Sequence, residues 1–75
     1  MMKDANYYYF LQKLETEYLG IDYSDLEKEF LENKWEFHGV ENSGKISTYR
    51  WQFQKRQFVL IVVDNSNEKI KEVIL

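Results

Sequence analysis

The chain has 75 residues, of which 44% are hydrophobic and 17% aromatic, and its formal net charge at pH 7 is −3. A chain of this length forms one domain, so residues 1–75 are expected to fold as a single unit that buries only about 60% of its unfolded surface. Because the sequence contains no cysteine, thiol catalysis, thiolate metal sites and a disulfide-stabilised secreted scaffold are excluded. The longest apolar run, Phe58 to Val63, is too short to span a membrane, and no stretch resembles a signal peptide. We therefore expect a cytoplasmic protein without membrane contact.

The first predicted element is a helix that begins near Asp4, the expected N-cap residue. Its apolar residues follow the spacing of one helix face and comprise Tyr7, Phe10, Leu11, Leu14 and Tyr18. Gly20 is placed to end the helix in a left-handed conformation.

A second helix is predicted to start at Ser24, because Ser24 and Glu27 have the spacing of a capping box. Its buried side is expected to contain Leu26, Phe30 and Leu31. Another side carries an acidic stripe, which consists of Asp22, Asp25, Glu29 and Glu32. This stripe is either a solvated helix surface or a binding site for a basic partner.

The first strand is predicted over residues 34–40, with Trp35 and Phe37 facing the core. A three-residue loop that places Gly44 at positive φ would follow it. This loop pairs Phe37 with Tyr49 and Trp35 with Trp51. It also sets Glu36 opposite Arg50, which is a favourable cross-strand charge pair.

The central hairpin is predicted over residues 46–63. Tyr49, Trp51 and Phe53 alternate with polar residues, and the apolar run 58–63 is rich in β-branched residues. A turn centred on Lys55 and Arg56 would place Phe53 opposite Phe58. The same register pairs Trp51 with Leu60 and Tyr49 with Val62, all on the core face.

The last segment, residues 68–75, follows a turn at 64–67 and fits either a strand or a helix. A strand is favoured by its β-branched content and its short length. The predicted fold class is therefore α+β, with two N-terminal helices packed on one face of a three- or four-stranded antiparallel meander sheet.

The predicted register leaves an apolar strip on the outer face of the sheet. Val59, Ile61 and Val63 would point away from the core, with Val40 and Ile46 opposite each other on the same side. An even loop in the last hairpin would add Ile70 and Ile74. A small protein seldom leaves such a strip in water, so we expect it to contact a second copy in a homodimer or another protein.

Enzymatic chemistry has little support in the sequence. His38 is the only histidine, no nucleophile motif accompanies it, and neither a phosphate-binding loop nor ligands at metal spacing are present. We expect no catalytic residue, no metal and no cofactor. Nucleic-acid binding is an alternative, because Arg50, Lys55 and Arg56 lie among aromatic residues. The net negative charge opposes it.

Residues 25–75, with the segment LENKWEF before the first strand, resemble HicA-type messenger-RNA-interfering toxins in the order of their elements. The resemblance implies RNA cleavage by a histidine that follows a Gly-Ser pair in a strand. The corresponding stretch here is Ser43-Gly44-Lys45, which contains no histidine.

The function that these observations favour is a small, non-enzymatic protein–protein interaction module, either an adaptor or an inhibitor. It would act through the outer apolar sheet face and the acidic stripe. The composition, which lacks proline, would suit an accessory protein of a low-GC bacterium or its phage. The alternatives are a nucleic-acid-binding protein and a small RNA-cleaving toxin-like protein.

Overall fold

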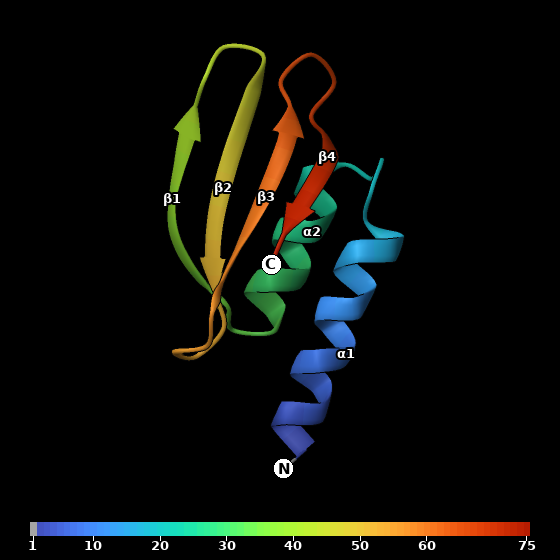
Figure 1. The fold of residues 1–75 in the computed structure, drawn as a ribbon, viewed down its shortest axis with the longest axis vertical. Helices are drawn as coiled ribbons and strands as arrows, with labels where there is room; N and C mark the ends of the chain where they lie inside the picture. Colours follow the sequence, from blue (N-terminus) through green and yellow to red (C-terminus); the bar gives the residue numbers. More distant parts are fainter. Residues whose placement is uncertain (1) are drawn as a thin grey trace.

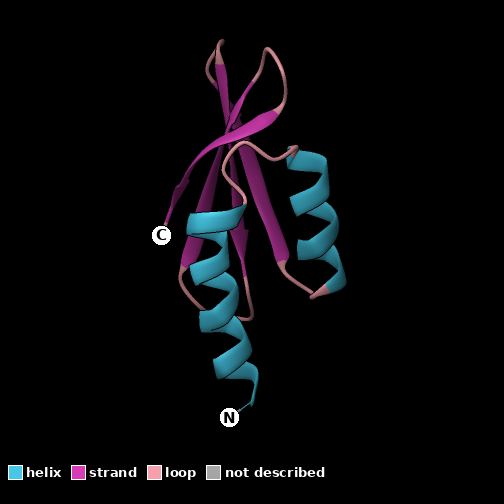
Figure 2. Ribbon diagram, turned by 90° about the vertical axis from the view of Figure 1, so that its right-hand side faces the viewer, coloured by secondary structure: helices cyan, strands magenta, loops and turns pink. Residues whose placement is uncertain are grey.

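The computed structural model describes residues 2–75, and the side chains from Tyr7 onward. Two helices precede four strands, namely α1 (Met2–Glu17), α2 (Tyr23–Glu32), β1 (Glu36–Asn42), β2 (Ile46–Gln52), β3 (Phe58–Asp64) and β4 (Lys69–Ile74). The strands form one antiparallel sheet in the order β1-β2-β3-β4. In Figure 1, α2 lies behind the sheet and α1 runs beside it on the β4 side, and Figure 2 shows the helices from that side. The predicted α+β fold is confirmed, and the last segment is a strand.

Helix α1 packs through the predicted stripe. Its residues Tyr7, Leu11 and Leu14 are buried in the core, as is Tyr18, which directly follows the helix. The centroid of the Phe10 ring lies 5.8 Å from that of the Phe30 ring of α2. The predicted N-cap is wrong, because Asp4 lies inside α1.

Helix α2 begins at Tyr23, before the predicted start at Ser24. Its N-cap residue is Asp22, and Ser24 lies inside the helix, so the capping box is wrong. The Asp22 side chain makes no capping hydrogen bond and instead accepts one from Lys69 Nζ of β4 at 2.9 Å. The buried side consists of Tyr23, Leu26 and Phe30, whereas Leu31 is 61% exposed.

The connection between the helices runs along the free edge of β4. Gly20, at φ +82° as predicted for the end of α1, donates its N–H to the Ile70 carbonyl at 2.8 Å. The Ile70 N–H in turn donates to Ile21, and the Tyr23 N–H donates to Glu68. Backbone groups that an edge strand would leave open are therefore paired within the chain.

The register between β1 and β2 differs from the prediction. Ser43 and Ile46 close a two-residue turn, in which Gly44 has φ +78°. The positive φ of Gly44 is confirmed and the three-residue loop is wrong. A β-bulge between Phe37 and Gly39 shifts the pairs further along β1.

As a result, the three predicted cross-strand pairs do not form. Phe37 lies opposite Trp51, Val40 lies opposite Tyr49, and Glu36 lies opposite Gln52 rather than Arg50. Trp35 precedes β1 and is buried in the core without pairing to Trp51.

The register between β2 and β3 differs from the predicted register by one residue. The Phe53 carbonyl accepts a hydrogen bond from Arg56 N–H at 2.9 Å, and Gln54 and Lys55 between them have φ +44° and +50°. Positive φ at both central residues is what a type I′ turn requires. This turn alone would place Trp51 opposite Phe58, and the additional residue Gln57 places it opposite Val59. The predicted turn, centred on Lys55 and Arg56, would place it opposite Leu60.

Candidate functional site

The displaced register exchanges the two faces of β3. Since side chains alternate along a strand, a shift of one residue moves each side chain to the other side of the sheet. Val59, Ile61 and Val63 are buried in the core, and Ile61 is 0% exposed. The prediction that these three residues form an outer surface is therefore wrong.

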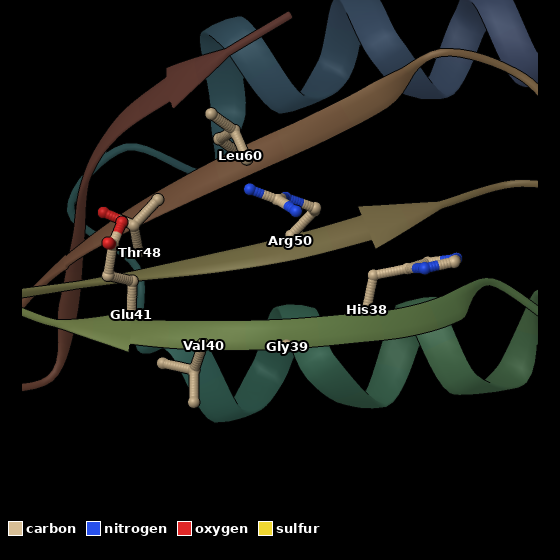
Figure 3. A pocket seen from close by; sticks show the side chains of 7 residues that line it. All are labelled: His38, Gly39, Val40, Glu41, Thr48, Arg50 and Leu60. Carbon is tan, nitrogen blue, oxygen red and sulfur yellow. The ribbon is translucent and has the colours of Figure 1, made fainter.

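The predicted pairing of Val40 with Ile46 does not form. Val40 lies opposite Tyr49 and Ile46 lies opposite Asp64, so the two do not face each other. Figure 3 shows the Val40 side chain pointing to the side opposite that of Thr48 and Arg50. Of the five predicted residues, Ile46 alone lies on the outer face. Ile70, opposite Val63, is buried in the core.

An apolar strip does occupy the outer face, and it consists of Phe58, Leu60 and Val62 of β3 with Ile74 of β4. Leu60 lies opposite Arg50 of β2 on one side and Ile74 on the other. Phe58 is 44% exposed and Ile74 is 43% exposed, Leu60 is half-buried, and Val62 is buried between its neighbours. We call these four residues the outer strip.

The sequence did not identify the outer strip because every position from Phe58 to Val63 is apolar. Such a run carries no alternation that distinguishes one face of the strand from the other. The register depends instead on the turn before β3, where neither Gln54 nor Lys55 is a residue type that favours positive φ. No signal in the sequence indicates the correct face.

A hollow of about 340 Å³ lies beside the outer strip. Gly39, which has no side chain and has φ +126°, is one of the residues that line it. Figure 3 shows the surrounding side chains on one side of the sheet, namely those of His38, Glu41, Thr48, Arg50 and Leu60. The hollow is thus bordered by a carboxylate, an imidazole, a guanidinium and the edge of the outer strip.

Two of these side chains pack on Phe58 of the outer strip. The His38 ring meets the Phe58 ring edge-on, with 4.9 Å between centroids. The Arg50 guanidinium lies 5.7 Å from the centroid of the same ring, within the range of a cation–π interaction. His38 Nε2 also lies 3.6 Å from a carboxylate oxygen of the exposed Glu36. These contacts fix the orientation of an aromatic side chain whose outer surface is open.

The acidic stripe on α2 is only partly a free surface. Asp22 is bound to Lys69, whereas Asp25 and Glu32 are exposed and Glu29 is half-buried. Burial, together with the charges of Glu29, Glu17 and Asp25, raises the pKa of the Tyr18 phenol, and Lys13 opposes this shift. The charges of two of the four stripe residues, Glu29 and Asp25, therefore act on the buried residue that follows α1.

Among the side chains that the structure describes, no group of three or more His, Cys, Asp or Glu residues is arranged to hold a metal ion. No described helix is both long enough and apolar enough to cross a membrane.

Comparisons with protein-family models, with curated proteins and with solved structures gave no match for this chain.

Proposed function

We propose that the protein is a non-enzymatic protein–protein interaction module whose contact surface is the outer face of the sheet. The observation that supports this proposal is the outer strip. The core is built from the other face of the sheet and the two helices, while Phe58 and Ile74 remain nearly half exposed. Apolar side chains gathered on one face of a small protein are typical of a surface that binds another protein.

The arrangement around the strip supports the same proposal. Phe58, the aromatic residue of the strip, is held by His38 and Arg50. An aromatic side chain whose orientation is already fixed loses little conformational entropy on binding. Aromatic residues and arginine are also the types enriched at the centre of protein interfaces.

The acidic stripe would have a secondary role in this proposal. Asp25 and Glu32 are exposed, so their charges would speed the approach of a basic partner rather than form the contact itself. We further propose that the module acts in the cytoplasm. Disulfides rarely persist there, and this chain contains no cysteine to form one.

Single-stranded nucleic acid is the second candidate partner, and one observation favours it. The open Phe58 ring with Arg50 beside it resembles the aromatic and basic pairs on which bases stack. Glu41 on the same face opposes a phosphate backbone. A gel shift with RNA and DNA oligonucleotides at low salt decides between the two, because protein binding predicts no shift.

The test of the main proposal uses the protein as bait in a lysate of its source organism. Leu60→Lys places a charge at the centre of the outer strip, and Leu31→Lys makes the same change at an exposed position of α2. We expect the wild type and Leu31→Lys to retain the same specific protein, and Leu60→Lys to lose it. Retention by all three baits would contradict binding through the outer face.

A further inference from the structure

We infer that the partner of the outer face is a second copy of this chain, so that the protein is a face-to-face homodimer. This inference rests on the proposed function, because it names the occupant of the same surface. It depends on three properties of the outer face, which are its position on the sheet, its area and the placement of two opposite charges.

The outer strip lies where two copies can meet symmetrically. In one row across the sheet, Arg50 of β2, Leu60 of β3 and Ile74 of β4 are neighbours. In the next row, Thr48, Val62 and Glu72 occupy the corresponding positions. The apolar residues of β3 are therefore flanked by β2 on one side and β4 on the other.

A two-fold axis parallel to β3 makes this surface self-complementary. Rotation about that axis places β3 of one copy over β3 of the other, and β2 over β4. Phe58, Leu60 and Val62 then meet the same residues of the second copy along the axis. Two-fold dimers are the commonest assemblies of identical chains, and two twisted sheets pack face to face in nearly this alignment.

The same operation brings opposite charges together. Arg50 lies on β2 and Glu72 lies on β4, one row apart, and both are exposed. With β2 over β4 of the second copy, each Arg50 is within side-chain reach of a Glu72 across the interface. Because the axis repeats every contact, the dimer has two such pairs, one on each side of the apolar strip.

The area of the face fits a reversible dimer. Strands of seven residues extend about 23 Å, and four strands span about 19 Å. Two faces of this size bury roughly 900 Å², which is below the roughly 1,200 Å² of stable specific interfaces and within the range of weak, transient ones. We therefore expect association in the micromolar range rather than an obligate dimer.

Sedimentation equilibrium on the full chain tests this inference through a charge exchange. Arg50→Glu and Glu72→Arg each create two like-charge contacts in the dimer, so each should weaken self-association by about tenfold or more. The double variant R50E/E72R restores opposite charges and should associate more tightly than either single variant, without full recovery because the guanidinium beside Phe58 is absent. Both residues are exposed, so all three variants should fold, and circular dichroism checks this.

Two results would overturn the inference. One is a wild-type chain that stays monomeric at millimolar concentration, and the other is a dimer whose affinity the charge exchange leaves unchanged. In either case the bait experiment with Leu60→Lys distinguishes the two proposals. If Leu60→Lys loses a bound protein other than this chain, the outer face remains a protein interaction surface. If no binding depends on Leu60, neither the homodimer nor the proposed function holds.

Discussion

The indole Nε1 of Trp51 donates a hydrogen bond to the hydroxyl of Tyr23 at 2.9 Å, and both side chains are buried. Trp51 lies in β2, and Tyr23 is the first residue of α2. The Tyr23 ring also stacks on the Tyr49 ring, with 3.9 Å between centroids. One polar contact inside an aromatic core therefore fixes where α2 begins relative to the sheet.

Removing the acceptor of this bond should destabilise the fold. Tyr23→Phe keeps the ring but leaves the buried indole N–H without its partner, which costs about 1–3 kcal/mol. Urea denaturation followed by tryptophan fluorescence measures the change. Tyr9→Phe, at an exposed position of α1, is the control and should change the free energy of unfolding by less than about 0.5 kcal/mol. Equal stability of the two variants would contradict a buried bond.

The same tyrosine should make the fold sensitive to alkaline pH. Burial raises the pKa of the Tyr23 phenol well above its ordinary value, with the hydrogen bond from Trp51 opposing and the charges of Glu27 and Tyr49 adding to the shift. The folded state thus holds the neutral phenol, while the unfolded chain ionises above about pH 10. Stability present below that pH is lost as the pH rises through and beyond it.

Tyr23→Phe cannot ionise, so its free energy of unfolding should fall less steeply above pH 10 than that of the wild type. Part of the slope remains, because burial also raises the pKa of Tyr7 and Tyr18. Urea titrations at several pH values between 8 and 11 measure both slopes. Identical slopes would mean that Tyr23 is not held neutral by the fold.

The sequence predicted the elements of this fold better than their registers. The buried stripe of α1 and the positive φ at Gly20 and Gly44 follow from spacing and turn chemistry, and all are confirmed. The registers depend on features without a sequence signal. These are the bulge beside Gly39 and a turn that holds Gln54 and Lys55 at positive φ.

The errors in the predicted registers mainly changed which residues were assigned to the candidate site. Its location on the outer face of β3 was expected, but its residues were not, because a one-residue shift exchanges Leu60 for Ile61. The start of α2 was missed for a different reason. Asp22 makes no capping bond there, and the linker is held instead by backbone bonds to β4, which are long-range contacts that no local motif predicts.

Asn65 joins the two turns at one end of the sheet. Its Nδ2 donates to the Gly44 carbonyl at 2.7 Å, and its Oδ1 accepts from the Ser47 hydroxyl at 2.7 Å. Asn65→Ala leaves the buried Ser47 hydroxyl without an acceptor and should cost about 1–2 kcal/mol. Urea denaturation of Asn65→Ala, Ser47→Ala and the double variant gives the coupling energy. Strictly additive losses would contradict a direct bond.

The turn between β2 and β3 offers a gain in stability. Gln54 and Lys55 both have positive φ, which Asn and Gly adopt at lower cost. The double substitution Gln54→Asn with Lys55→Gly should raise the free energy of unfolding by about 1 kcal/mol. Thermal and urea denaturation measure the gain. A loss of stability would indicate that the turn is centred elsewhere and that the β3 register differs.

Lysine substitutions at two adjacent positions of β3 distinguish the two faces of the sheet. Leu60 is half-buried on the outer face and Ile61 is 0% exposed in the core, so the two faces make opposite predictions. Leu60→Lys should fold, because the lysine stem can lie along the outer strip with its charge in water. Ile61→Lys should not fold, because it buries an unpaired charge.

The measurement is far-ultraviolet circular dichroism with urea denaturation of both variants, followed by binding assays on each variant that folds. We expect a folded Leu60→Lys that has lost self-association or partner binding, and an unfolded Ile61→Lys. A folded Ile61→Lys beside an unfolded Leu60→Lys would contradict the register. A folded Leu60→Lys with undiminished binding would contradict the outer face as the contact surface.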